Sequence, residues 1–503
     1  MSVYHYVACD LGAESGRVML GTLQDDRLSL EEIHRFPNHG TTVLGSLRWD
    51  VLRLLDELKT GLKMVGRRSL PVSSISCDSW GVDYVLLQEN EPLLTVPYHY
   101  RDARTDGGME RVFAHVSAEE IFAETGIQFM PLNTLYQLHE DALRRPEILA
   151  AAGLFLNIAD YFNYLFSGVA RAEESIASTT QLYDPKAKGW SKRLAAKLGI
   201  PAGVFPHTVP SGTVLGHLLP DLAAELGLKG VQIVAGLSHD TGAAVAAVPA
   251  EGREWGYLSS GTWSLLGVEA PEPIVTSKSR EYNFTNEVGF GHSIRFLKNI
   301  IGLWIVQECR RVWANQGEEY TYAELVRMAE AAPPMKALID PADPRFGRPD
   351  DMPSAIGQFC RETGQTPPST PGEVIRSVLE SLALLYRLTV EQLEEVTGRK
   401  LTTLHIVGGG SKNALLNQFT ADALGRRVVA GPAECTAIGN ILVQAIALGH
   451  CPSLTSARKV VRESFPLVTY EPERQRQWEE AYRQLREWRS SGRKHHQSEG
   501  ARE

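Results

Sequence analysis

Short apolar runs alternate with polar turns along the chain, and longer stretches of helical spacing lie between them. Residues 4–10 form an apolar run, a glycine-containing turn follows, and residues 17–23 resume a β-type pattern. This order predicts a β-hairpin. A third strand is expected over 27–36. Residues 50–66 carry apolar side chains at helical spacing, with Asp50 as the helix cap.

The next part of the chain predicts two more strands and a helical region. Residues 72–83 and 84–87 have the apolar, β-branched pattern of strands. The pattern is helical over 117–165, with glycine and proline interruptions. The aromatic side chains of 154–166 follow helical spacing, and core packing accounts for them better than ligand binding does.

One stretch, Gly230–Ala247, combines a buried strand with a charged junction. The apolar run 231–237 ends in Ser-His-Asp-Thr, and a run of small residues predicts a tightly packed helix after it. Asp240 therefore lies at the carboxyl end of a strand, where open α/β sheets bind ligands. The alternative is that Asp240 is only the N-cap of the following helix.

The pattern of the first half returns about 250 residues later. Residues 257–268 again read as strand, polar turn and strand. A helix over 377–397 then precedes a strand at 403–407, a glycine turn, and a helix at 414–424. This order predicts an α/β protein with a duplicated domain and a cleft between the two copies.

The expected domain boundary lies near residues 248–254, a short stretch rich in proline, glycine and charge. The C-terminal end is polar and lacks apolar periodicity, which is typical of disorder. The predicted organisation is an N-terminal domain at 1–248, a C-terminal domain at 249–465, a helix at 466–489 and a disordered tail at 490–503.

Composition limits the classes of function. The chain has 503 residues, 43% of them hydrophobic and 22% charged, and a net charge of −9, which is typical of a soluble globular protein. The acidic balance argues against nucleic acid and anionic membranes as partners. We find no membrane-spanning run and no signal peptide, and the six scattered cysteines indicate reduced thiols without a metal site. These features predict a cytoplasmic protein.

Three turns have the small-residue composition of phosphate-binding loops. They lie at Gly12–Gly16, Ser259–Thr262 and Gly408–Ser411, each after an apolar strand. Such turns present backbone N–H groups to phosphate. Each alone is a commonplace hairpin turn, but three of them favour a nucleotide held from two sides. Asp10, just before the first turn, either holds Mg²⁺, directly or through water, or only caps the turn.

These features resemble the FGGY carbohydrate kinases of the actin-like ATPase superfamily, over about residues 5–465. The resemblance is carried by ACDLGAESGRVML, DSWGVDYVLL, YRDARTDG, SHDTGAAV, YLSSGTWSLLG, LKNIIGLWIVQE and LHIVGGGSKNALLNQFTADALGRRV. It implies two ribonuclease-H-like domains with the active site in an interdomain cleft.

The resemblance also implies roles for residues on the sugar side. Asp240 matches the general base that accepts the proton of the sugar hydroxyl as its oxygen attacks the γ-phosphorus of ATP. His239 and Thr241 match substrate contacts beside that base. Gly81 matches a sugar-binding loop, where a missing side chain lets the ketose approach the backbone, and Asn299 matches a further substrate contact.

On the nucleotide side the resemblance implies contacts in all three turns and in one helix. Position 14 departs from the family, which has a small residue more often there. A carboxylate beside triphosphate would be repelled, so we expect Glu14 to point outward or to pair with Arg17. The implied ATP contacts are Ala13, Glu14 (through its backbone), Ser15, Gly16, Arg17, Thr262, Gln307 and Gly409.

Several alternatives remain open at this point. His239 alone would be a packing histidine, and the matched quartet favours the substrate role. Asn299 and Gln307 lie eight residues apart in a stretch that reads as helical, which would place them on one face. Arg101 and Arg104 belong to a charged loop that either closes over the sugar or forms a solvated ion-pair network.

The resemblance implies an ATP- and Mg²⁺-dependent kinase of a small ketose. Within the family, SHDT, SSGTWSLLG and LKNIIGLW favour L-rhamnulose, phosphorylated at its 1-hydroxyl. Xylulose and fuculose are the alternative substrates, since one methyl group or stereocentre changes discrimination by only about 1–3 kcal/mol. A nucleotide-switched binding protein of the same fold is the alternative from another class. A monomer or small homo-oligomer is expected.

Overall fold

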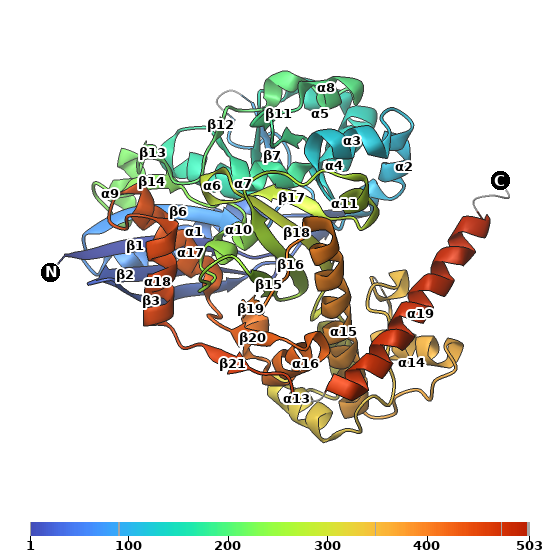
Figure 1. The fold of residues 1–503 in the computed structure, drawn as a ribbon. Helices are drawn as coiled ribbons and strands as arrows, with labels where there is room; N and C mark the ends of the chain where they lie inside the picture. Colours follow the sequence, from blue (N-terminus) through green and yellow to red (C-terminus); the bar gives the residue numbers. More distant parts are fainter. Residues whose placement is uncertain (1, 89–90, 348, 474, 500–503) are drawn as a thin grey trace. The chain divides into compact units, whose positions relative to one another are not determined.

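The structure is a computed structural model, and it describes residues 2–88, 91–347, 349–473 and 475–499, with side chains to residue 489. The chain forms two compact units, drawn with the rest of the fold in Figure 1. Neither unit is contiguous in sequence. Unit 1 comprises Met1–Pro249, Val268–Leu297 and Glu434–Phe465, and unit 2 comprises Ala250–Gly267, Lys298–Ala433 and Pro466–Glu503.

A six-stranded sheet forms the centre of unit 1, in the order β13-β14-β6-β1-β2-β3. The predicted hairpin and third strand are confirmed, because β1 pairs antiparallel with β2 and β2 with β3. β1 and β14 each pair parallel with β6. The strands are β1 (Val3–Leu11), β2 (Ser15–Gln24), β3 (Arg27–Pro37), β6 (Val72–Ser79), β13 (Thr213–His217) and β14 (Gln232–Ala235).

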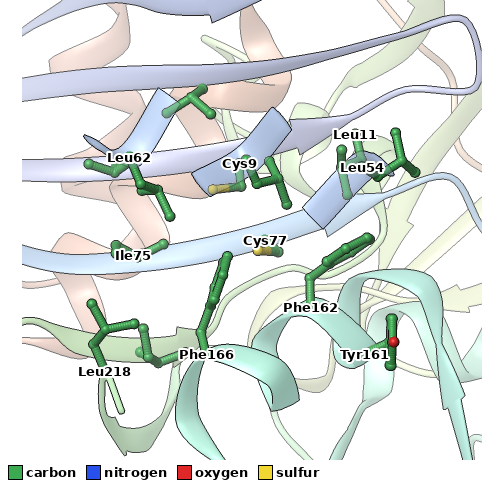
Figure 2. Packing of buried hydrophobic residues seen from close by; sticks show 14 of the residues in the cluster. Cys9, Leu11, Leu54, Leu62, Ile75, Cys77, Tyr161, Phe162, Phe166 and Leu218 are labelled. Carbon is green, nitrogen blue, oxygen red and sulfur yellow. The ribbon is translucent and has the colours of Figure 1, made fainter. Parts of the chain in front are cut away.

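Two helices bury their apolar faces on this sheet. α1 (Val51–Gly66) begins after Asp50, whose side chain accepts from the backbone N–H of Arg53 at 3.0 Å. Its leucines and the aromatic side chains of α6 (Ile158–Ser167) form one core with the strands, as Figure 2 shows. Cys9 and Cys77 lie in the same core as small apolar side chains. Tyr161, Phe162 and Phe166 are thus core residues, as predicted.

One predicted helical segment is a strand. Residues 154–157 form β8 (Leu154–Asn157), which pairs antiparallel with β7 (Tyr84–Leu87), and the helix begins only at Ile158. A run of three apolar residues, Leu154 to Leu156, fits either period, and its pairing with a distant strand decides between the two.

The remaining elements of unit 1 include two helices, α17 and α18, that come from the C-terminal part of the chain. These remaining elements are β4 (Thr41–Val43), β5 (Ser46–Arg48), α2 (Gly108–Phe113), α3 (Ala118–Thr125), α4 (Thr134–Arg144), α5 (Pro146–Ala151), β9 (Ala172–Glu173), α7 (Glu174–Ala177), β10 (Tyr183–Asp184), β11 (Gly189–Trp190), α8 (Lys192–Lys197), β12 (Thr208–Val209), α9 (Pro220–Leu226), α10 (Asp240–Ala246), α11 (Ser277–Glu281), β17 (Thr285–Val288), α17 (Cys435–Ala447) and α18 (Leu454–Ser464).

Unit 2 repeats the strand pattern of unit 1. β15 (Trp255–Ser260) forms a hairpin with β16 (Trp263–Ala270) and pairs parallel with β19 (Thr403–Val407). β19 in turn pairs parallel with β20 (Arg427–Ala430), and β20 pairs antiparallel with β21 (Val468–Tyr470). In unit 1, β1 likewise forms a hairpin with β2 and pairs parallel with β6, and β6 pairs parallel with β14. The same order of strand pairings thus occurs in both units, and the predicted duplication is confirmed.

Unit 2 contains α15, the longest helix in the described part of the chain. The helices of this unit are α12 (Trp304–Asn315), α13 (Tyr322–Ala331), α14 (Met352–Glu362), α15 (Pro371–Thr397), α16 (Ala414–Leu424) and α19 (Gln475–Glu499). α19 includes residues 490–499 of the predicted disordered tail, and residues 500–503 of that tail lie outside the described residues. No helix in the described part of the chain is long and apolar enough to cross a membrane.

The stretch from Leu297 to Glu308 was predicted to be helical, and that prediction is wrong. β18 (Ile294–Ile301) ends at Ile301, and α12 begins at Trp304. Gly302 lies between the two elements, and a side chain there has no room, because a Cβ would lie 2.7 Å from the carbonyl oxygen of Gly261. Asn299 is therefore on a strand and Gln307 on a helix, and they do not share a helical face.

Within unit 1, α17 lies directly against α10, the helix that begins at Asp240. The two backbones meet at Gly439, where a Cβ would lie 1.8 Å from the carbonyl oxygen of Ala243. The small residues of both helices permit this approach, as the sequence predicts for α10. α17 also donates from Gln444 Nε2 to the carbonyl oxygen of Val7 on β1 at 3.0 Å.

We expect Gly439→Ala to destabilise the protein by about 1–3 kcal/mol, because the added methyl group overlaps a backbone that cannot move freely. Gly357→Ala in α14 is the control, since a Cβ there meets nothing closer than 3.6 Å and alanine favours the helix. Urea unfolding followed by tryptophan fluorescence measures both. Equal midpoints for the two variants would contradict the close contact between α10 and α17.

Candidate active site

Asp240 is the first residue of α10, five residues after β14 ends at Ala235. The N-cap of this helix is His239, so the alternative that Asp240 is the cap is wrong. Asp240 Oδ1 accepts from the backbone N–H of Thr241 at 2.5 Å and from its hydroxyl at 3.2 Å. The Asp240 side chain keeps 30% of its surface exposed, enough to reach a bound ligand.

The loop before Asp240 is held by buried polar groups. Ser238 donates from its backbone N–H to Glu173 at 3.0 Å and from its hydroxyl to Asp160 at 3.2 Å. His239 donates its backbone N–H to the hydroxyl of Ser175 at 3.1 Å. Burial raises the pKa of both Asp160 and Glu173. The loop is thus fixed by side chains from α6, β9 and α7.

The side chain of His239 is buried against a charged pair in the β17–β18 hairpin. Its Nδ1 lies 3.1 Å from Arg295 Nη2 and 3.2 Å from Glu287 Oε2. Its Nε2 lies 3.5 Å from Asp240 Oδ1. His239 therefore has polar partners on both ring nitrogens, which is more than packing requires.

Two further carboxylates lie near Asp240 in unit 1. Asp10 on β1 is the register partner of Asp78 on β6, and it pairs with Arg17, which also pairs with Glu434. Asn440 of α17 donates to Asp78 Oδ2 at 2.5 Å. Asp78 Oδ1 is buried and has no hydrogen-bond partner among the described residues.

The pKa values of Asp78 and Asp240 are raised in this cluster. Burial, and next the negative charge of Asp10, raise the pKa of Asp78 well above its usual range. Burial also raises the pKa of Asp240; Asp10 adds to this rise, whereas His239 and Thr241 oppose it. A partly exposed carboxyl of raised pKa beside polar partners, as at Asp240, is typical of a proton-accepting site.

The first phosphate-type turn is the β1–β2 connection. The N–H of Gly12 donates to the carbonyl oxygen of Ser15 at 3.0 Å, and Asn38 Nδ2 donates to the carbonyl oxygen of Gly12 at 2.8 Å. Ala13 is partly buried and Glu14 is exposed, as expected for a side chain pointing outward. Gly16 has no room for a side chain, because a Cβ would lie 2.2 Å from the Phe36 ring.

Gly81 is required by a neighbouring side chain. A Cβ there would lie 2.9 Å from Thr179 Oγ1, and the same Oγ1 accepts from the backbone N–H of Val82 at 3.2 Å. Val82 has a positive φ of 66°, so the loop is tightly bent at this point. The close approach of Thr179 explains the glycine without a ligand.

In unit 2 the structure brings two predicted nucleotide residues together. Gln307 Nε2 on α12 donates to Thr262 Oγ1, in the β15–β16 turn, at 3.1 Å. The glycine turn after β19 packs against β15, since a Cβ on Gly410 would lie 2.0 Å from Ser260 Oγ. Gly409 is exposed, and a Cβ there would meet nothing within 4 Å. Its backbone is therefore open to a ligand.

The predicted residues thus divide between the two units. Unit 1 holds the turn from Ala13 to Arg17 together with Asp10, Gly81 and the residues 239–241, and unit 2 holds Thr262, Gln307, Gly409 and Asn299. No group of three or more His, Cys, Asp or Glu side chains in the described part of the chain is arranged to hold a metal ion by itself.

The charged loop after β7 forms ion pairs inside the protein. Arg104, whose side chain is 8% exposed, pairs with Asp141 at 2.5 Å and lies over the ring of Tyr98. An ion-pair network is therefore correct for Arg104, although the network is buried rather than solvated.

Sequence reasoning missed Asp78, Asn440, Glu287 and Arg295. Two signals were available for the last pair. Arg295 lies within a largely apolar strand, and Glu287 lies in the short strand before it. A charged residue in a buried strand is rarely left without a partner of opposite charge, so the two could have been expected to pair.

Comparison with known proteins agrees with this arrangement. Residues 5–247 match the FGGY family of carbohydrate kinases, N-terminal domain, and residues 256–448 match its C-terminal domain. A protein named rhamnulokinase from Bacteroides thetaiotaomicron is 43% identical over 480 residues, which cover 95% of this chain and 98% of the relative. A rhamnulokinase from Bacillus subtilis is 38% identical over 467 residues, covering 93% and 95%.

Solved structures of the same fold are more distant in sequence. Gluconate kinase from Lactobacillus acidophilus superposes with a TM-score of 0.80 at 15% identity, covering 96% of each chain. Xylulose kinase from the same organism gives 0.79 at 16% identity, again covering 96% of each chain. The fold is that of these two-domain α/β kinases. Both family domains and close relatives span nearly the whole chain, and the protein therefore belongs to the FGGY family of carbohydrate kinases.

Proposed function

We propose that this protein transfers the γ-phosphoryl group of ATP to the 1-hydroxyl of L-rhamnulose, giving L-rhamnulose 1-phosphate and ADP, in L-rhamnose catabolism. Relatives that carry the name rhamnulokinase, at 38–43% identity over more than nine-tenths of the chain, support this substrate. The observation that carries the chemistry is Asp240, a carboxylate of raised pKa at the end of β14, partly exposed and with polar partners around it.

In this proposal Asp240 is the general base. It accepts the proton of the 1-hydroxyl as that oxygen attacks the γ-phosphorus, and it orients the nucleophile beforehand. Phosphoryl transfer depends mostly on such positioning and on charge stabilisation. His239, Thr241 and Asn299 are the proposed ketose contacts, with the backbone at Gly81.

We assign the nucleotide to the three turns. The backbone N–H groups of the β1–β2 turn would hold phosphate oxygens, together with the cation of Arg17. Thr262 and Gln307, already joined by a hydrogen bond, would act as one nucleotide contact. The open backbone at Gly409 would lie against the adenosine. The contacts of the first turn are Ala13, Glu14, Ser15, Gly16 and Arg17.

We also propose that Asp10 holds Mg²⁺, directly or through water. The donor set suits this ion, because Mg²⁺ binds one or two carboxylates together with substrate phosphates. The buried Asp78 Oδ1, which has no hydrogen-bond partner among the described residues, is a further unsatisfied oxygen beside Asp10. The ion would neutralise charge on the phosphates when bound.

The broader setting is also a proposal. We assign sugar binding, the catalytic Asp240 and the first phosphate turn to the N-terminal domain at 1–248, and the remaining nucleotide binding to the C-terminal domain at 249–465. We propose a cytoplasmic enzyme that acts as a monomer or small homo-oligomer, without nucleic-acid partners. Xylulose or fuculose would be the alternative substrates within the family.

A panel of ketoses tests the substrate. With ATP and Mg²⁺, we expect L-rhamnulose to give the highest kcat/KM in a coupled ADP assay, and NMR of the product to show phosphate on carbon 1. Xylulose and fuculose should be discriminated against by about 1–3 kcal/mol per altered contact. ADP release that is independent of sugar, with no sugar phosphate formed, would instead indicate a nucleotide switch.

Asp240→Asn should lower kcat with L-rhamnulose by roughly 10²–10⁴-fold, because it removes the proton acceptor and leaves the shape of the side chain. ATP affinity should stay within about threefold. The thermal midpoint of Asp240→Asn at neutral pH should be higher than that of the wild type, since burial disfavours the charged form of Asp240. Asp221→Asn, an exposed aspartate in the first turn of α9, is the matched control. Near-normal turnover in Asp240→Asn would refute its role as base.

The pH dependence of kcat/KM reports the same group. Asp240 must be ionised to accept a proton, and burial raises its pKa above the ordinary value of 3.8. Activity should therefore be lost on the acid side at a pH above that value, as pH falls through the raised pKa. Circular dichroism at each pH separates this loss from unfolding. An acid limb at or below 3.8 would contradict the buried environment of Asp240.

A further inference from the structure

A buried ion pair in unit 1 has no part in the reaction described so far. Glu287 on β17 and Arg295 on β18 are direct register partners across an antiparallel hairpin. Their side chains are 5% and 1% exposed, and Arg295 Nη1 lies 3.0 Å from Glu287 Oε2. Arg295 Nε also donates to the carbonyl oxygen of Val288 at 3.1 Å. The guanidinium is thus held rigidly.

Such a pair is a poor way to stabilise a fold. Removing two charges from water costs several kcal/mol for each ion, and apolar side chains of similar volume often serve equally well. Stability of the fold therefore does not explain this buried pair, and its contacts with other groups are more informative. Here the third group in contact with both partners is His239, next to Asp240.

Arg295 contacts the catalytic segment in two ways. Its Nη2 lies 3.1 Å from His239 Nδ1. Its guanidinium also lies against the first turn of α10, because a Cβ on Gly242 would be 3.5 Å from both Cζ and Nη2. A larger residue at position 242 would push the guanidinium away from His239. The small residue and the buried arginine therefore fit together.

This contact determines the tautomer of His239. A guanidinium has only donors, so the hydrogen bond from Arg295 Nη2 requires an Nδ1 that accepts and carries no proton. Glu287 Oε2 lies 3.2 Å from the same Nδ1 but is not in hydrogen-bond geometry with it, so it does not take a proton from Nδ1. The neutral ring then carries its proton on Nε2. That nitrogen lies 3.5 Å from Asp240 Oδ1, on the side of the ring where the proposed base is located. Glu287 keeps Arg295 in place by balancing its charge.

We propose that Glu287 and Arg295 are positioning residues, which hold His239 as its Nε2–H tautomer so that it presents a hydrogen-bond donor beside Asp240. The donor would serve an oxygen of the bound ketose or the Asp240 carboxylate. Neither Glu287 nor Arg295 touches substrate. This inference rests on the proposed function, since it assigns the pair to the ketose-binding side of that reaction.

Kinetics of Glu287→Gln test the proposal. The variant keeps the shape of the side chain but removes the charge that holds Arg295. We expect kcat/KM for the ketose to fall by roughly 10- to 100-fold, since small misplacements of a reacting group have effects of this size. KM for ATP should stay within about twofold. The control is Glu380→Gln, which alters an equally buried pair with Arg376 in α15 of unit 2, at 2.7 Å. It should leave ketose kinetics within about twofold.

A double-mutant cycle with His239→Asn separates positioning from a general structural role. If Glu287 acts through His239, adding Glu287→Gln to His239→Asn should change kcat/KM by less than about twofold. The same fold loss in both backgrounds would overturn the proposal. An equal loss in Glu380→Gln would overturn it too.

A charge-free replacement covers the case in which Glu287→Gln does not fold. Glu287→Leu combined with Arg295→Met removes both charges, so the thermal midpoint should stay near that of the wild type. Ketose kcat/KM should still be low, because no donor faces Nδ1. Near-normal activity in this folded variant would refute the positioning role. Each variant's kcat/KM is divided by that of the wild type, measured on the ketose that the wild type phosphorylates best. If that ketose is not L-rhamnulose, the ketose panel shows it, and the test of Glu287 and Arg295 is unaffected.

Discussion

A negative charge at a buried strand–helix junction is the constraint on which unit 1 depends. Asp240 must stay close to polar partners that tolerate its carboxylate, and it must keep enough exposed surface to reach a ligand. Thr241 donates to the Asp240 carboxylate and His239 lies beside it, so the charge has polar partners. The carboxylate stays partly exposed because it lies beyond the carboxyl end of β14. Burial still raises the pKa of Asp240, which suits a group that accepts a proton.

The rest of unit 1 serves to hold this junction still. α17 comes from the C-terminal part of the chain and packs on α10 through Gly439, while its Asn440 reaches Asp78 beside β1. Glu173 and Ser175 fix the loop before Asp240 from another direction. Residues that are distant in sequence thus converge on a few atoms. The non-contiguous make-up of the unit follows from this convergence.

Much of this could be predicted from the sequence, because the signals are local. The β1–β2 hairpin, the Asp50 cap and the bounds of β19 and α16 follow from runs and turns of adjacent residues. The position of Asp240 at a strand end is equally local. β8 was missed because its short apolar run fits either period until the distant strand β7 pairs with it. The end of β18 was missed because its apolar run continues almost directly into α12. The partners of His239 were missed because Glu287 and Arg295 lie about 50 residues further along the chain.

The central claim is that Asp240 supplies the base for phosphoryl transfer to a ketose. Single-turnover kinetics test it most directly, because they separate chemistry from product release. Enzyme saturated with ATP and Mg²⁺ is mixed with limiting L-rhamnulose and quenched at increasing times, for the wild type and for Asp240→Asn. The account predicts rapid formation of sugar phosphate in the wild type, and in the variant a bound but unreacted ketose. Equal single-turnover rates would contradict it.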